Sequence, residues 1–206
     1  MRVVCVSDMH GRHRDLAVPE GDLLLCAGDI SLRGEESVVR DFDRWMGEQP
    51  HRHKIVIAGN HDLCFERGPA ARRWLMHTRY LQDELAVVEG LRVWGSPWQP
   101  WFLDWAFNLA RGEALREKWD MIPDGTDILL THGPPFGVLD RTVRGESVGC
   151  EELLAAVRRV RPRLHVFGHI HEGYGVSEAE GTLFVNASSC DVRYRAVQAP
   201  VVVDLP

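Results

Sequence analysis

The sequence has no long hydrophobic run and little cysteine. No stretch approaches the roughly 18 consecutive apolar residues of a membrane-spanning helix, which excludes a helical membrane protein. The five cysteines are scattered and form no C-x-x-C pair, so we expect reduced thiols and a cytoplasmic location rather than a disulfide framework. Because residues 1–8 enter a strand-like run at once, we also expect no signal peptide.

Lysine is almost absent as well. Lys54 and Lys118 are the only two lysines, and 24 basic residues stand against 30 acidic ones, for a net charge of −6. No basic stripe runs along the sequence, so we expect no extended nucleic-acid-binding surface. Repeats and low-complexity segments are lacking too. We interpret residues 1–206 as a single globular domain, because the candidate functional residues lie in both halves.

Five short segments carry residues of the kind that bind metal ions. Each segment follows an apolar, strand-like run, at residues 2–6, 23–27, 54–58, 127–130 and 164–167. Ligands of open α/β sheets collect at the carboxyl ends of strands, so we expect the five segments to meet. The segments are Asp8-Met9-His10, Gly28-Asp29, Gly59-Asn60-His61-Asp62, Thr131-His132-Gly133 and Gly168-His169-Ile170-His171.

The chemistry of these side chains favours a particular class of metal. Carboxylates, imidazoles and an amide oxygen suit Mn, Fe, Zn or Co, and suit Mg less well. Asp8 and His10 alternate along an extended backbone, as do His169 and His171, so each pair can reach one cavity. Each segment alone is weak evidence, because such residues are common in turns and helix caps. Their joint occurrence at five strand ends predicts a dinuclear metal centre.

The spacing of apolar residues predicts helices between these strands, over residues 35–46, 69–76, 113–121 and 151–160. The runs 85–88 and 91–94 around Glu89-Gly90 predict a hairpin. Further strands are expected near residues 174–176, 182–185 and 201–203. Helices that alternate with strands, followed by a strand-rich end, favour a mixed α/β fold with two sheets.

The five segments, in this order, resemble the calcineurin-like metallophosphoesterase superfamily, whose signature is D-x-H, G-D, G-N-H-[DE], a later H and G-H-x-H. The resemblance extends over residues 1 to about 190. Residues 95–100 and 186–190 are most similar to the small metallophosphoesterase-domain-containing branch, which is related to class III cyclic-nucleotide phosphodiesterases. The resemblance implies an α/β fold of four αββα layers, with two mixed β-sheets flanked by helices.

The resemblance also implies two divalent metal ions, with manganese the most typical and Fe, Zn, Co or Mg as alternatives. It implies a small phosphodiester or nucleotide substrate, attacked by a metal-bridging hydroxide while His61 protonates the leaving group and Asp62 holds His61. The sequence does not identify substrate-binding residues. The implied ligands are Asp8, His10 and His171 for the first metal, Asn60, His132 and His169 for the second, and Asp29 as the bridge.

Two other functions compete with a phosphodiesterase. A phosphomonoesterase of the same fold remains an alternative. The protein-phosphatase form is disfavoured for two reasons. Those enzymes usually carry Arg at the position of Ala58, and they tend to carry Asp-Arg-Gly where residues 32–34 of this chain read Leu-Arg-Gly. A non-catalytic scaffold is the third alternative, but the intact His61, His169 and His171 argue against a decayed site.

Several other polar and aromatic residues are interpreted as structural. Arg33 could touch a phosphate, but we expect it to be solvated. Arg193, Tyr194 and Arg195 could rim the site, but we expect them to serve packing and solubility. Among the dense tryptophans, Trp98 and Trp101 could stack on a nucleobase, although packing is favoured. The remaining histidines are expected to be solvated or in the core, and they are His13, His51, His53, His77 and His165.

Overall fold

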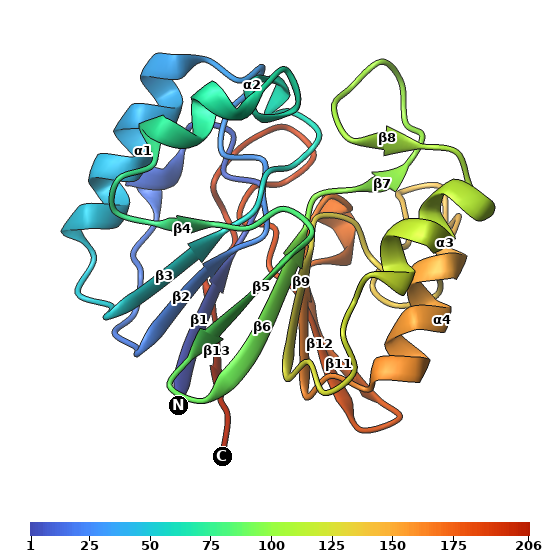
Figure 1. The fold of residues 1–206 in the computed structure, drawn as a ribbon. Helices are drawn as coiled ribbons and strands as arrows, with labels where there is room; N and C mark the ends of the chain where they lie inside the picture. The colour runs from blue at the N-terminus through green and yellow to red at the C-terminus, as the bar shows by residue number, and fades with distance from the viewer.

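The computed structural model describes residues 1–206 and contains two large mixed sheets (Figure 1). The strands of the first sheet are β1 (Arg2–Val6), β2 (Leu23–Cys26), β3 (His53–Val56), β4 (Arg79–Tyr80) and β13 (Val201–Asp204). Those of the second are β5 (Glu84–Val88), β6 (Leu91–Ser96), β9 (Ile128–Thr131), β10 (Leu164–Phe167), β11 (Gly175–Ala179) and β12 (Thr182–Asn186). Their orders are β13-β1-β2-β3-β4 and β11-β12-β10-β9-β6-β5. The outer pairs β1/β13, β11/β12 and β5/β6 are antiparallel, and the rest are parallel.

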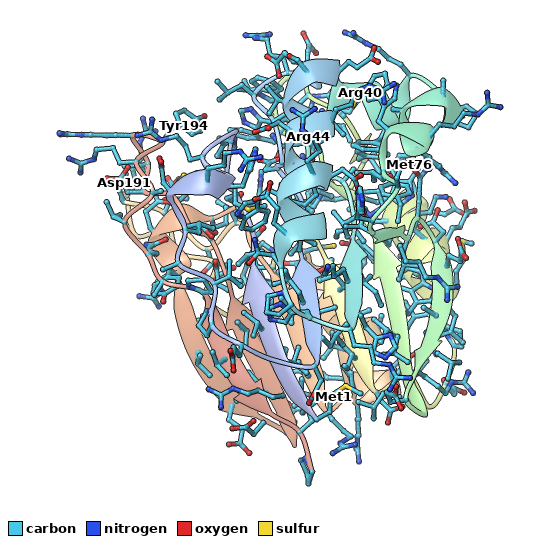
Figure 2. All side chains as sticks on the ribbon, turned by 90° about the vertical axis from the view of Figure 1, so that its left-hand side faces the viewer. Met1, Arg40, Arg44, Met76, Asp191 and Tyr194 are labelled. Carbon is cyan, nitrogen blue, oxygen red and sulfur yellow. The ribbon has the colours of Figure 1, made fainter.

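Helices cover the outer face of each sheet (Figure 1). The first sheet is covered by α1 (Glu36–Glu48), α2 (Leu63–Glu66) and the 3-10 helix η2 (Pro69–Trp74), and the second by α3 (Glu113–Asp120) and α4 (Glu151–Val160). In α1, Val39, Phe42 and Met46 are buried at helical spacing, while Arg40 and Arg44 point outward (Figure 2). The predicted αββα sandwich of two mixed sheets is therefore confirmed.

Strand alternation sorts the apolar side chains into separate cores. Val3 and Cys5 of β1 face the second sheet, while Val4 and Val6 of the same strand pack toward α1. A third core lies between the second sheet and the helices α3 and α4, around Trp119. Each fully buried valine or leucine contributes about 1.5–3 kcal/mol, so the core between the sheets holds them firmly together.

Most predicted elements agree with the structure to within a few residues. The predicted hairpin is confirmed as β5 and β6, with Val88 opposite Leu91 and positive φ at both turn residues, Glu89 and Gly90. The segment predicted as a helix over 69–76 is a 3-10 helix that ends at Trp74. Four elements were not predicted, because they are too short to show periodicity. They are α2, β4, and the strands β7 (Gln99–Pro100) and β8 (Asn108–Leu109), which pair with each other. No helix has both the length and the apolar character needed to cross a membrane.

The five strands that precede the candidate ligands end at one edge of the sandwich. There the two sheets are joined directly, because Ser7 after β1 pairs with Ser188 after β12. The Ser189 N–H also donates to the Ser7 carbonyl at 2.8 Å. Loops from both sheets therefore surround the same space.

Candidate metal centre

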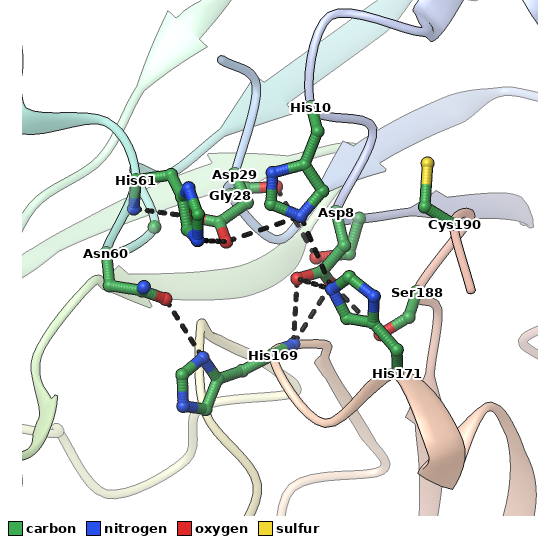
Figure 3. A network of polar contacts seen from close by, with 12 residues as sticks. Asp8, His10, Gly28, Asp29, Asn60, His61, His169, His171, Ser188 and Cys190 are labelled. Carbon is green, nitrogen blue, oxygen red and sulfur yellow. Dashed lines mark hydrogen bonds and ion pairs between the residues drawn. The ribbon is translucent and has the colours of Figure 1, made fainter. Parts of the chain in front are cut away.

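All of the predicted metal ligands lie together at this shared edge (Figure 3). Asp8, His10, Asp29 and His169 have φ values of 52°, 46°, 53° and 68°, in the left-handed region. Such strain costs about 1–3 kcal/mol per residue and concentrates at functional sites, where the surrounding structure maintains it. Here the turns direct side chains from five strand ends toward one point.

A first group consists of Asp8, His10 and His171, drawn from both sheets. The Nε2 atoms of His10 and His171 lie 3.3 Å apart, and His171 Nε2 lies 3.3 Å from Asp8 Oδ1. Ser188 Oγ lies 3.0 Å from Asp8 Oδ2 and 2.8 Å from Asn186 Oδ1, so its hydroxyl hydrogen is shared between these acceptors and supports the Asp8 carboxylate from the far side. The nitrogen and oxygen atoms of this group thus converge without a basic residue between them.

A second group consists of Asn60, His132 and His169. The Asn60 Oδ1 atom lies 2.8 Å from His132 Nε2 and 2.9 Å from His169 Nδ1. Asp29 lies between the two groups, with Oδ2 at 3.7 Å from His10 Nε2 and Oδ1 at 3.5 Å from His132 Nε2. Its two oxygens therefore face different groups, as a bridging carboxylate requires.

Backbone carbonyls orient two of these imidazoles. His171 Nδ1 lies 3.0 Å from the Asp191 carbonyl, and His132 Nδ1 lies 2.8 Å from the Ala27 carbonyl. An Nδ1–H that donates to a carbonyl leaves the Nε2 lone pair free to point at the cluster. This is the tautomer that metal ligation needs.

The electrostatics of the cluster call for added positive charge. Asp8, Asp29 and Asp62 are all buried, and the basic partners that lie within 4 Å of Asp8 and Asp29 are histidines only. Burial, with the charges of Asp8 and Asp62, raises the pKa of Asp29 well above its usual range. Burial also lowers the pKa of His10 to about 3, despite the nearby Asp8. Burial opposes the charge on His171, but the hydrogen bond to Asp8 raises the pKa of that imidazole to about 9. Buried carboxylates next to imidazole nitrogens fit divalent cations well, and a bound cation would displace this proton.

Two glycines leave the space that this packing requires. A Cβ atom at Gly59 would overlap the Asp29 carboxylate and the His132 ring. A Cβ atom at Gly168 would overlap the Asp8 carboxylate and Ser7. Both glycines therefore allow backbone to approach ligand side chains more closely than any other residue could.

The structure corrects the expected contact between Asp62 and His61. His61 Nδ1 lies 2.9 Å from the Leu32 carbonyl, not from the Asp62 carboxylate. Asp62 instead accepts hydrogen bonds from the backbone N–H groups of Ile30, Ser31 and Gly59 and from Ser31 Oγ. Consecutive residues point in different directions, so Asp62 does not bind the His61 ring; it acts on His61 through the loop that presents Leu32 and through its charge.

Three residues beside the cluster were not predicted to belong to it. Ser188 holds Asp8, as described above. Trp105 stacks on the His61 ring with centroids 4.0 Å apart. The Tyr194 ring lies 4.5 Å from that of His10 and lines the cavity at the cluster, which agrees with the alternative in which Tyr194 rims the site. Tyr194 and Asp191 share the loop before β13, far from Met1 (Figure 2). The density of tryptophans was the one signal in the sequence that pointed to Trp105.

The remaining tryptophans, Arg33 and the histidines outside the cluster lie in different surroundings. Trp98 packs against Phe107 and donates to Asp83, as the packing interpretation predicts. Trp101 is 65% exposed and lines a cavity next to His169. Arg33 is exposed as expected, and its guanidinium also lies over Trp105. Of the histidines outside the cluster, the buried ones are His13, His51 and His165.

Comparisons with known proteins agree with this geometry. Residues 1–173, which include every candidate ligand, match the family described as Calcineurin-like phosphoesterase. The chain is 49% identical to human metallophosphoesterase domain-containing protein 1, in a match that covers all of this chain and 71% of the relative. It is 37% identical to a UPF0046 protein of Caenorhabditis elegans, over all of this chain and 60% of the relative. Among solved structures, phosphopantetheinyl hydrolase of Mycobacterium tuberculosis is similar in fold, with a TM-score of 0.62, 16% identity and coverage of 93% and 90% of the two chains.

Proposed function

Because the chain belongs to the calcineurin-like phosphoesterase family, whose name denotes hydrolysis of phosphoric esters, we propose that it is a metal-dependent phosphodiesterase. We propose nucleotides or cyclic nucleotides as its substrates. The cluster supports the metal dependence, because its donors converge from both sheets and the only basic partners of its carboxylates are imidazoles, which can bind metal. We further propose that the protein prefers diesters to monoesters.

The observation that carries the diester preference is a pair of adjoining cavities. One, of about 190 Å³, is lined by cluster residues together with Tyr194. The other, of about 370 Å³, is lined by Trp101, Arg111 and Pro134 among others. The two share His169, Phe102 and Glu172 along their boundary. A phosphorus atom at the cluster could therefore carry one substituent in each cavity, as a phosphodiester does.

The residues that would hold two metal ions are those of the two groups, with Asp29 between them. When bound, the ions would supply a hydroxide nucleophile near neutral pH and neutralise charge on the phosphoryl oxygens. Manganese is the ion that we propose, on the basis of the mixed oxygen and nitrogen donors. Elemental analysis of protein purified without added metal tests that choice.

His61 is placed to supply a proton. Its Nδ1 is held by the Leu32 carbonyl, and its Nε2 faces the cluster, 4.0 Å from Asp29 Oδ2. Burial lowers the pKa of this imidazole, which makes its protonated form a stronger acid. As the bond between phosphorus and the leaving oxygen breaks, the proton on Nε2 would pass to that oxygen. Asp62 would act by positioning, through the loop that it ties together.

A comparison of two chromogenic substrates tests the proposal. Bis-p-nitrophenyl phosphate and p-nitrophenyl phosphate are assayed with added Mn²⁺, and a higher kcat/KM for the diester is expected. A higher value for the monoester would identify a phosphomonoesterase and overturn the diester proposal. No hydrolysis with any divalent metal would favour a non-catalytic scaffold. The cytoplasmic location remains a prediction, which cell fractionation checks.

A further inference from the structure

The ring of His61 has few direct supports. Its Nδ1 makes one hydrogen bond, to the Leu32 carbonyl. The main-chain N–H of His61 donates to Asp29 Oδ1 at 2.8 Å, which fixes the backbone but not the ring. The torsion that turns an imidazole has a broad, roughly two-fold profile, so one hydrogen bond leaves the ring plane loosely defined. A proton donor needs a better-defined direction than this.

Trp105 supplies a second support. Its indole stacks on the imidazole with centroids 4.0 Å apart and planes 25° apart. The His10 ring meets the same imidazole edge-on at 4.6 Å, so His61 is enclosed from two directions. Trp105 is half-buried, and the Arg33 guanidinium lies over its ring at 5.1 Å from the centroid. Arg33 and His61 therefore both lie against the Trp105 indole.

The loop that carries Trp105 is itself tied to the segment that carries His61. The Ala106 N–H donates to the Asn60 carbonyl at 3.0 Å, and the Phe107 N–H donates to Glu66 at 2.6 Å. Within the loop, the Asn108 side chain donates to the Trp105 carbonyl at 3.0 Å. These bonds fix the main chain at Trp105 relative to the main chain that carries His61, although the two residues are far apart in sequence, and the stacking then sets the two rings against each other.

We propose that Trp105 is a positioning residue for His61, and that it holds the imidazole with Nε2 directed at the leaving oxygen. Arg33 keeps the indole in place by lying over it. This inference rests on the proposed function only in so far as His61 acts as the proton donor. By this proposal Trp105 acts through His61 and does not touch the substrate.

The dependence of kcat on the leaving group distinguishes a positioning role of Trp105 from a general loss of protein stability. Loss of proton delivery slows the release of phenolate, a poor leaving group, much more than that of p-nitrophenolate, a good one. We expect Trp105→Leu to lower kcat for diphenyl phosphate by about 10²-fold, toward the full effect of losing a general acid, and kcat for bis-p-nitrophenyl phosphate by less than about tenfold. Trp105→Phe, which retains a stacking ring, should restore most of the loss with diphenyl phosphate.

Trp74→Leu is the matched control. Trp74 is also half-buried and also lies under an arginine, with Arg40 at 5.8 Å, but it packs on the α1 side of the first sheet. This variant should keep the wild-type ratio of the two substrates. Equal losses on both substrates in Trp105→Leu, at unchanged metal content, would overturn the positioning role.

A crystal structure of metal-free Trp105→Leu gives a readout that does not depend on activity. The His61 ring should occupy more than one orientation, while in Trp105→Phe it should keep one. A single, wild-type orientation in Trp105→Leu would overturn the inference even if the protein hydrolyses diesters. Should the wild type hydrolyse no phosphodiester, the proposed function fails, and the ring orientation still decides whether Trp105 positions His61.

Discussion

The two sheets contribute different chemistry to the one cluster. Loops after β1, β2 and β3 of the first sheet supply both cluster carboxylates, Asp8 and Asp29. Loops after β9 and β10 of the second sheet supply imidazoles only, from His132, His169 and His171. The cluster carboxylates are thus concentrated on one side of the interface, and the other side contributes imidazole nitrogens only.

Because the donors are divided in this way, neither sheet carries a complete site. The two sides are linked by hydrogen bonds from the His169 N–H to both Asp8 oxygens, at 3.0 and 3.1 Å, and by Ser188 Oγ to Asp8. The carboxylates should therefore control how tightly cations bind. Residues that only link or orient the two sides should have smaller effects.

The largest effect is expected from Asp29→Asn, because Asp29 is the carboxylate that faces both groups. Activity should fall by more than about 10³-fold, beyond the loss of a single electrostatic stabiliser. Chelation should lower the Tm of the wild type by about 5–10 °C, the equivalent of binding at about 100 times Kd, and leave the variant unchanged. Differential scanning calorimetry with and without EDTA checks this. An equal Tm shift in both proteins would show that Asp29 holds no metal.

His61→Ala should lower kcat for diphenyl phosphate, whose phenolate is a poor leaving group, by about 10²–10⁴-fold and leave the metal content unchanged, because this first-sheet residue is expected to move a proton and not to bind metal. His132→Ala, from the second sheet, is the contrasting variant and should lose metal as well as activity. Elemental analysis and steady-state kinetics on the same preparations distinguish the two. Near-wild-type turnover in His61→Ala would remove the proposed proton donor.

Ser188→Ala should have a smaller effect, because Ser188 only orients Asp8 across the interface. Partners of this kind typically cost about 10–100-fold in metal affinity when removed. We expect weaker Mn²⁺ binding with little change in kcat at saturating metal, as measured by titration calorimetry and kinetics. Ser189→Ala is the control, since its buried Oγ has no hydrogen-bond partner. If the two variants bind Mn²⁺ equally, Ser188 does not support Asp8.

The convergence of the candidate ligands at the strand ends could be predicted from the sequence, because local patterns determine where the strands end. An apolar run followed by Gly-Asp or Gly-His specifies both the strand and the turn after it, as in the segments that carry Asp29 and His169. The carboxyl ends of neighbouring parallel strands then necessarily meet. The same reasoning gave the hairpin and the long amphipathic helices.

The supports of His61 could not be predicted in this way. Trp105 reaches the imidazole only because the β7–β8 loop folds back onto the segment after β3, and no periodicity encodes that path. The family resemblance implied Asp62 as the partner, whereas its carboxylate turns to the backbone of Ile30 and Ser31. Tyr194 is brought to His10 by a loop with a positive φ of 57°, which its own sequence does not reveal.

The smallest expected effect concerns His165, a buried histidine of the second sheet that lies outside the cluster. Its Nε2 pairs with Thr131 Oγ1 at 2.8 Å, its Nδ1 has no partner, and burial lowers its pKa to about 3. The unfolded chain takes up this proton near pH 6.5, whereas the folded protein does so only near pH 3. The resulting stability is therefore fully present above about pH 6.5 and is lost as the pH falls toward about 3.

His165→Leu should remove this dependence, because it deletes the titrating group while Thr131 Oγ1 keeps its bond to the Gly133 carbonyl. Between about pH 7.5 and about pH 5.5, the metal-free wild type should lose about 1.4 kcal/mol more free energy of unfolding than the variant. Urea denaturation at the two pH values measures the difference. Equal losses of free energy of unfolding in the wild type and the variant would mean that His165 is protonated in the folded protein. The second sheet would then tolerate charge in its core as well as at its edge.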